Sequence, residues 1–127
     1  MKSEVGSMNE EVEHLTIRTK KFALRIIQLY SALPNTTPAQ VIGKQVLRSG
    51  TSVGANYREA YRSRSKQEFT STMGLCLKEL EETSYWLDLL SEAAIVQKEK
   101  LEQLRDECDQ LIAIFVTIIK KRKFHTS

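Results

Sequence analysis

The sequence has few of the residues that interrupt helices. Its 127 residues include only two Pro and five Gly, which favours long helices over a fold with many turns. No apolar run approaches the roughly 20 residues that a transmembrane helix needs. The first seven residues, Met1–Ser7, lack the apolar segment of a secretion signal. We therefore expect a cytoplasmic protein that makes no contact with membranes.

His and Cys are equally scarce, with two of each. Di-iron bundles need a Glu-x-x-His motif on each of two helices, whereas this chain has that spacing only once, at Glu11–His14, and His125 has no such Glu before it. Cys76 and Cys108 fall on apolar helical faces, which predicts reduced thiols in the core. The glycines are scattered and form no phosphate-binding loop. We therefore expect no enzyme activity, no cofactor, no metal and no small-molecule substrate.

Four segments carry apolar residues at alternating spacings of three and four, the pattern of a helix with one buried face. Their short connections predict an all-α, antiparallel up-down-up-down four-helix bundle. We expect the bundle to span residues 9–122, between a flexible arm at 1–8 and a basic tail at 123–127. The predicted helices run from Asn9 to Pro34, from Thr37 to about Arg62, from Ser65 to a turn at 94–98, and from there to the basic end.

Two of these helix starts carry capping patterns. Thr37 is the expected cap of the second helix, with Pro38 in the first helical position and Gln40 completing a capping box. Ser65 and Glu68 form the same pattern at the start of the third helix.

The second helix has an unusual predicted face, because small and polar residues replace the usual Leu and Ile. Its members are Ala39, Ile42, Val46, Ser49, Val53, Asn56, Ala60 and Ser63, with Gly50 and Gly54 beside them. Small side chains let another helix approach closely, although each Gly costs about 1 kcal/mol of helix propensity. A buried Asn56 would need hydrogen-bond partners. The face is either a locally polar core or a device that gives a subunit interface its specificity.

An acidic cluster on the third helix also has two interpretations. Glu79 and Glu82 either form surface ion pairs with Arg48, Arg58 or Arg62, or Glu79 joins a partly buried network with Glu59, Asn56 and Thr83. An enzyme would have only Glu59, Glu79 and Glu82 as candidate groups. The candidate interhelix or interface residues are Ser49, Gly50, Val53, Gly54, Asn56, Glu59, Glu79 and Thr83.

The formal net charge of +3 hides a strong segregation of charge along the chain. Residues 44–66 hold six Lys or Arg and one Glu, whereas residues 78–109 hold ten acidic and four basic residues. Interleaved Tyr57 and Tyr61 offer stacking surfaces for bases. The alternative is a solvated face, or a surface that pairs with the acidic helices of a neighbouring subunit. The candidate nucleic-acid contacts are Arg58, Arg62, Arg64, Lys66, Lys120, Lys121, Arg122 and Lys123.

Two stretches, Leu47–Ala60 and Leu77–Thr83, resemble the signature of small bacterial four-helix-bundle proteins encoded by 23S rRNA intervening sequences. The resemblance covers about residues 15–120, and Ala60-Tyr61 departs from the small residue that usually follows the Glu. The matching positions are Arg48, Ser52, Val53, Asn56, Glu59, Glu79, Leu80 and Glu81.

This resemblance implies a homopentamer of bundles around a central channel. It also implies a relation to the accessory variability protein of diversity-generating retroelements, a basic pentamer that associates with nucleic acid and a reverse transcriptase. It implies no catalytic residues. The sequence thus predicts a non-enzymatic oligomeric bundle that binds RNA or DNA through its clustered basic residues. The alternative is a protein-interaction scaffold whose segregated charges serve subunit assembly.

Overall fold

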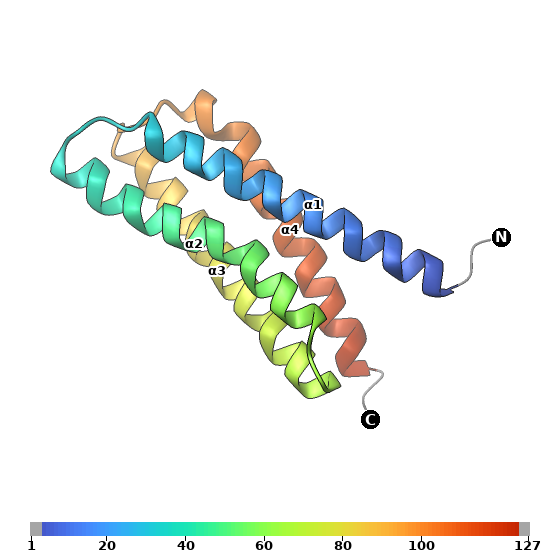
Figure 1. Cartoon of the computed structure of the whole chain (residues 1–127). Coiled ribbons are helices and arrows are strands. Elements are labelled where there is room, and N and C mark those ends of the chain that lie inside the picture. The colour runs from blue at the N-terminus through green and yellow to red at the C-terminus, as the bar shows by residue number, and fades with distance from the viewer. Residues whose placement is uncertain (1–3, 125–127) are drawn as a thin grey trace.

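The protein folds as four long helices, each of which runs antiparallel to the helix before it in the chain (Figure 1). A computed structural model describes the backbone of residues 4–124 and the side chains of residues 10–121. Residues 4–124 contain no strand, so the predicted all-α class is confirmed. The helices are α1 (Glu4–Ser31), α2 (Thr37–Tyr61), α3 (Lys66–Glu92) and α4 (Lys98–Phe124).

The first and last helices, α1 and α4, are longer than the sequence pattern predicted. α1 begins at Glu4 instead of Asn9, because Gly6 is the only residue before Asn9 that opposes a helix and one Gly is tolerated. α4 continues through Phe124. The predicted arm at 1–8 and tail at 123–127 are therefore partly helical, and residues 1–3 and 125–127 lie outside the described chain.

The cap of α2 is Thr36, one residue before the predicted Thr37. Thr36 has extended backbone angles, and its side chain accepts a hydrogen bond from the Ala39 amide at 3.4 Å. Gln40 does not close a capping box, since its side chain donates to the Pro34 carbonyl and accepts from the Tyr30 hydroxyl, both at 3.1 Å. Ser65 caps α3 as predicted and accepts from the Glu68 amide at 3.0 Å.

The core lies where the apolar stripes of the four helices meet. Burying one Leu, Ile or Phe side chain in such a core contributes about 1.5–3 kcal/mol. The predicted stripes of α1, α3 and α4 are confirmed over most of their length. Their fully buried members include Leu15, Thr19, Phe22, Ile26, Met73, Cys76, Leu80, Thr83, Leu87, Leu90, Leu101, Leu104, Cys108, Leu111 and Phe115.

At two places the buried residue of α2 is the one that follows the predicted residue. Gly43 and Tyr57 are buried, whereas Ile42 and Asn56 are only half-buried. The physical reason is that α2 packs against both α1 and α3, so the centre of its buried face lies between two neighbours. The prediction assumed that α2 packs against one helix, so the predicted buried face is rotated about the helix axis relative to the observed one.

The glycines of α2 allow α1 to approach closely. A Cβ atom added at Gly50 would lie 2.7 Å from Ile26 Cγ1, and one added at Gly43 would lie 2.6 Å from Leu33 Cδ1. Real Cβ atoms essentially never make such contacts. The small residues therefore serve a tight α1–α2 crossing within one chain.

α1 and α4 contact each other less closely than the other neighbouring helices do. In Figure 1 the N-terminal end of α1 and the C-terminal end of α4 point apart. A bidentate ion pair joins the two helices near their middle. Arg18 Nε and Nη2 lie 2.8 and 2.7 Å from the two carboxylate oxygens of Glu107, and Nη2 also donates to Gln110 at 2.7 Å.

α3 ends in a Schellman motif with an unfavourable residue. The amides of Ala94 and Ile95 donate to the carbonyls of Ser91 and Leu90, each at 3.0 Å. This geometry places Ala94 in the left-handed region, with φ of 57°. Gly usually occupies that position because it has no Cβ to clash with the backbone.

We predict that Ala94→Gly stabilises the protein. Relief of the left-handed strain should exceed the entropy that Gly adds to the unfolded chain, so the free energy of unfolding should rise by about 0.5–1 kcal/mol. Urea denaturation at fixed protein concentration measures this difference. Ala93→Gly is the matched control, because Ala93 has a φ of −79°, and it should not stabilise. If the two substitutions changed the free energy of unfolding equally, Ala94 would not be strained.

Candidate nucleic-acid interface

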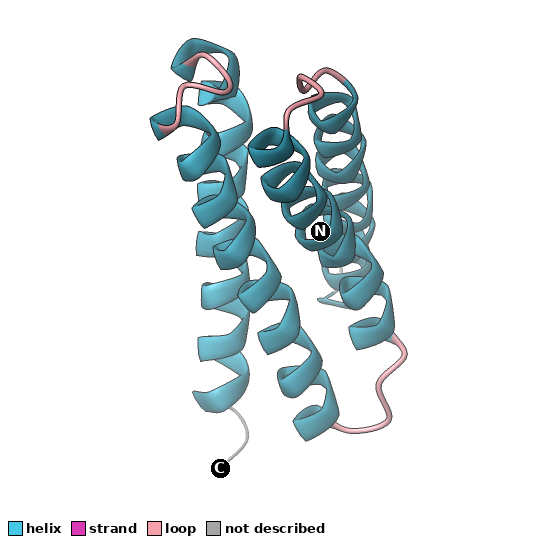
Figure 2. Ribbon diagram, turned by 90° about the vertical axis from the view of Figure 1, so that its left-hand side faces the viewer, coloured by secondary structure: helices cyan, strands magenta, loops and turns pink. Residues whose placement is uncertain are grey.

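The antiparallel topology brings the two basic segments of the sequence to one end of the bundle. The C-terminal end of α2, the α2–α3 turn and the C-terminal end of α4 lie together in two perpendicular views (Figures 1 and 2). We call this region the basic end. Its described cations are Arg58, Arg62, Arg64, Lys66, Lys120 and Lys121, all of which are exposed. The side chains of Arg122 and Lys123 lie outside the described residues.

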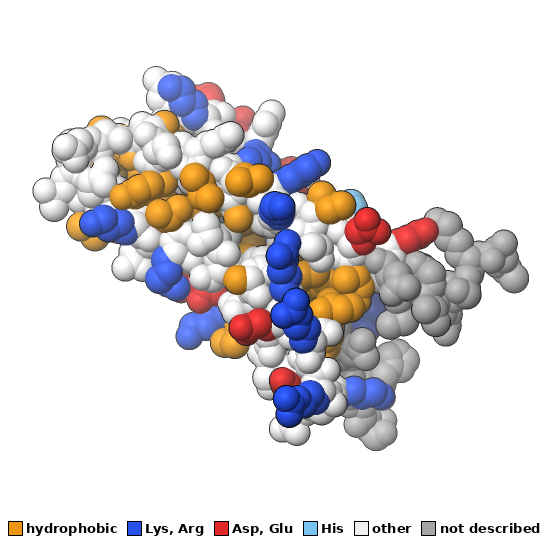
Figure 3. Space-filling view, in the orientation of Figure 1, with side chains coloured by type: hydrophobic (Ala, Val, Ile, Leu, Met, Phe, Trp, Pro, Cys, Tyr) orange, Lys and Arg blue, Asp and Glu red, His pale blue; other side chains and the backbone are white. Residues whose placement is uncertain are grey.

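The side chains of these cations form no ion pair with a described residue, although the Arg64 backbone amide donates to the Glu68 carboxylate at 3.3 Å and Glu11 lines a surface hollow together with Lys121. By contrast, the interhelical arginines are neutralised: Arg18 by Glu107, Arg48 by Glu79 and Glu82, and Arg105 by Asp88 at 2.6 Å. Figure 3 shows a line of Lys and Arg side chains that crosses from the middle of α1 over the C-terminal part of α2 to the α2–α3 turn. This face therefore offers positive charge to an outside partner.

The two tyrosines of the basic end have different roles. Tyr57 was a predicted stacking surface, but it is buried, with 2% of its surface exposed. Its ring makes edge contacts with Tyr61 and Phe115 at centroid distances of 5.6 and 5.7 Å, and burial raises the pKa of its hydroxyl above the usual value. Tyr61 is 45% exposed. Tyr61 is therefore the only one of the two that a base can reach.

A shallow cleft of about 340 Å³ lies at the α2–α3 turn. Tyr61 and Phe69 contribute aromatic rings to its lining, and Arg64 and Lys66 contribute cations. Ser63 also lines it, and the buried Ser63 Oγ has no hydrogen-bond partner among the described residues. An aromatic surface beside cations is the combination with which proteins hold single-stranded nucleic acid. The aromatic and basic residues were visible in the sequence, but their common cleft was not.

The candidate interhelix residues mostly lie at contacts inside the chain. Ser49 and Val53 are buried on α2, and the Ser49 and Thr83 hydroxyl oxygens lie 2.7 Å apart. Thr83 Oγ1 also lies 2.8 Å from the Glu79 carbonyl. Since each hydroxyl carries one proton, one donates across the α2–α3 seam and the other accepts.

The other candidates on α2 face α1 or the exterior. Gly50 contacts Ile26 closely, and a Cβ at Gly54 would lie 3.2 Å from Thr19 Oγ1. Asn56 is half-buried and makes no side-chain hydrogen bond with a described residue, and Glu59 is exposed. The predicted network of Glu59, Glu79, Asn56 and Thr83 is therefore not formed, because Asn56 is turned away from the seam that Ser49 and Thr83 occupy.

The alternative interpretation of the acidic cluster is confirmed for Arg48. Its guanidinium lies 3.1 Å from Glu79 Oε2 and also contacts Glu82, which accepts from the Trp86 indole at 3.4 Å. The hydrogen bond from Arg48 lowers the pKa of Glu82. This pair therefore contributes its stability near neutral pH and loses it as the pH falls through that lowered pKa.

The described residues contain little that suggests catalysis. Among residues 10–121, whose side chains the structure describes, no group of three or more His, Cys, Asp or Glu could hold a metal ion. Cys76 and Cys108 are buried free thiols, and burial raises the pKa of each to about 12. Such thiols stay protonated near neutral pH and are poor nucleophiles. Over residues 4–124, none of the helices has the length and apolar character to span a bilayer.

Comparison with known proteins identifies a family, and solved structures similar to this chain. The model of the 23S rRNA-intervening sequence protein family matches residues 13–117. A crystal structure of a protein of unknown function from the S23 ribosomal protein family of Bacteroides thetaiotaomicron is similar to this chain. The two share 37% sequence identity over 86% of this chain and 97% of the other, with a TM-score of 0.80. No curated protein matches the chain.

We predict an asymmetric response when the Ser49–Thr83 contact is cut. Thr83→Val leaves the buried Ser49 hydroxyl only the Val46 carbonyl, 3.5 Å away, and should cost about 1–3 kcal/mol of unfolding free energy. Ser49→Ala should cost less, because Thr83 keeps the Glu79 carbonyl. The double variant should be more stable than the sum of the single effects implies, as measured by urea denaturation. Additive losses would show that the two hydroxyls do not interact.

Proposed function

The chain belongs to the family of 23S rRNA-intervening sequence proteins, and from this premise we propose that it is a non-enzymatic, oligomeric bundle that binds RNA or DNA through the basic end. One observation carries the proposal. Six exposed cations lie at that end, and their side chains form no ion pair with a described residue. Nucleic-acid phosphates are the partners that such a surface fits best.

Binding of this kind depends on charge more than on sequence. Each phosphate that a Lys or Arg neutralises releases counterions, so affinity falls steeply as salt rises. Tyr61 adds a surface on which a base in a single-stranded segment can stack. We therefore propose a preference for RNA with unpaired loops over a duplex. The solved relative is described as a member of the S23 ribosomal protein family, which makes ribosomal RNA fragments the first ligands to test.

We further propose that the protein self-associates, as a pentamer by its family resemblance. Figure 3 shows hydrophobic side chains along α1 and the adjacent part of α2. Ile17, Leu24, Ile27 and Val41 are 43–58% exposed. On α1 these positions are separated by seven and three residues, which puts them on one helical face. A helix face with several exposed aliphatic side chains is typical of a protein–protein interface.

The alternative function, a protein-interaction scaffold without nucleic-acid binding, is favoured by the same apolar face. In that case the cations of the basic end meet acidic groups of a neighbouring subunit. Two of the acidic residues available for such contacts, Glu79 and Glu82, are already paired with Arg48 inside the chain. This internal pairing favours the nucleic-acid proposal over the scaffold.

The first test removes charge from the basic end. The triple variant Arg58→Ala, Arg62→Ala, Arg64→Ala should bind a labelled ribosomal RNA hairpin at least tenfold more weakly at low salt. Its plot of log affinity against log salt should be flatter by roughly 0.7–0.9 per lost phosphate contact. Fluorescence anisotropy at several salt concentrations measures both effects.

The matched control for this test removes three charges elsewhere, with Lys44→Ala, Lys78→Ala and Lys98→Ala, all at exposed positions. The control should bind RNA nearly as well as the unmodified protein. Equal losses in the two triple variants would mean that only net charge matters. Unchanged affinity in the arginine variant would exclude the basic end.

The second test addresses self-association. Leu24→Glu puts a charge into the proposed apolar interface and should lower the molar mass measured by light scattering. Leu75→Glu is the control, because Leu75 is similarly exposed, at 50%, but lies on α3. Its mass should not change. A lowered mass for Leu75→Glu alone would move the interface from α1 to α3.

A further inference from the structure

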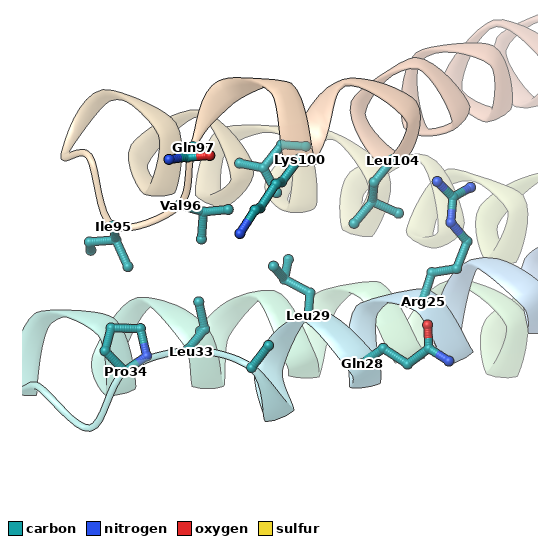
Figure 4. Close-up of a pocket in the computed structure, with 12 residues that line it drawn as sticks. Arg25, Gln28, Leu29, Leu33, Pro34, Ile95, Val96, Gln97, Lys100 and Leu104 are labelled. Carbon is teal, nitrogen blue, oxygen red and sulfur yellow. The ribbon is translucent and has the colours of Figure 1, made fainter.

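A second and larger cleft lies far from the basic end, between the C-terminal half of α1 and the start of α4 (Figure 4). Its volume of about 450 Å³ falls within the roughly 300–1,000 Å³ of small-molecule sites. It exists because α1 and α4 approach each other less closely than the other helix pairs. The residues that line it are Arg25, Gln28, Leu29, Ala32, Leu33, Pro34, Ile95, Val96, Gln97, Lys100, Leu101 and Leu104.

Two cations line this cleft, Arg25 from α1 and Lys100 from α4. They lie at different positions along the seam between the two helices. Figure 4 shows Arg25 extending from α1 toward Leu104, and Lys100 extending from α4 toward Leu29.

The charges of this cleft are therefore uncompensated. No described residue that lines it is acidic, and neither Arg25 nor Lys100 forms an ion pair with a described residue. Arg25 is half-buried, whereas Lys100 is exposed. Elsewhere on the same seam the half-buried Arg18 is paired with Glu107. An anion in the cleft would give Arg25 the partner that it lacks within the described chain.

The rest of the lining favours an anion with an apolar body. Leu29 of α1 and Leu33, which follows α1, face Val96 and Leu104 across the cleft in Figure 4. Gln28 and Gln97 also line the cleft, at exposed positions where their amides can hydrogen-bond a ligand or water. We propose that the α1–α4 cleft binds a free monocarboxylate with an aliphatic chain, of the class of medium-chain fatty acids.

In this proposal the carboxylate binds the Arg25 guanidinium, Lys100 adds positive charge to the same cleft, and the aliphatic chain lies along the leucines. A planar carboxylate matches the paired N–H groups of an Arg guanidinium. Transfer of the aliphatic chain from water to the leucine-lined surface stabilises the complex further. The site shares no residue with the basic end, so it stands or falls independently of nucleic-acid binding.

The test is an NMR titration of the full-length protein with octanoate, followed by amide chemical shifts. Saturable shifts should appear in residues 25–33 and 95–104 and leave the basic end unchanged. 1-Octanol has the chain without the charge, and propionate has the charge with a short chain. Each should bind at least tenfold more weakly than octanoate. Octanol binding with equal affinity, or octanoate shifts outside the cleft, would overturn the proposal.

Two variants test the role of the two cations. Lys100→Glu reverses one of the two charges that line the cleft and should abolish octanoate binding without loss of thermal stability. Arg25→Gln should weaken binding at least tenfold. Lys98→Glu makes the same charge change as Lys100→Glu outside the cleft and should alter affinity less than twofold. Octanoate binding by Lys100→Glu at the original affinity would overturn the proposal.

Discussion

The close crossing of α1 and α2 is the contact on which the rest of the bundle depends. Gly43 and Gly50 leave room for Leu33 and Ile26, so that two helix backbones approach where larger residues would clash. The opposite side of α2 is tied to α3 through the Ser49–Thr83 contact. α2 is therefore fixed on both sides, whereas α4 packs mainly on α3 and leaves the α1–α4 seam partly open.

This arrangement decides which charges remain available. Arginines at the helix seams form ion pairs with carboxylates of the same chain: Arg18 pairs with Glu107, and Arg48 pairs with Glu79. The cations of the basic end have no such partner. Arg58 and Lys120 lie near the C-terminal ends of α2 and α4, where the helix dipole favours positive charge. The fold can therefore hold several cations together at one end without neutralising them.

Much of this structure follows from the sequence, because the spacing of apolar residues fixes helix faces and Ser65 fixes a helix start. Four segments with this spacing and short connections predicted the bundle, and the family resemblance added the expectation of a pentamer. The predictions that were wrong concern residues whose burial depends on contacts between helices. Asn56 was expected in the buried seam, but the position belongs to Tyr57, since α2 packs against two neighbours at once. That Arg25 and Lys100 line one cleft follows only from the way α1 and α4 pack, which no local pattern encodes.

The most direct test of the central claim is hydrogen–deuterium exchange of the protein with and without a bound ribosomal RNA hairpin. If the basic end is the interface, RNA should slow exchange at the α2–α3 turn, residues 61–66, and near Lys120 and Lys121. Exchange in residues 25–33 and 95–104, at the other end of the bundle, should not change. Slowed exchange confined to that other end, or to the acidic surface of α3, would contradict the account.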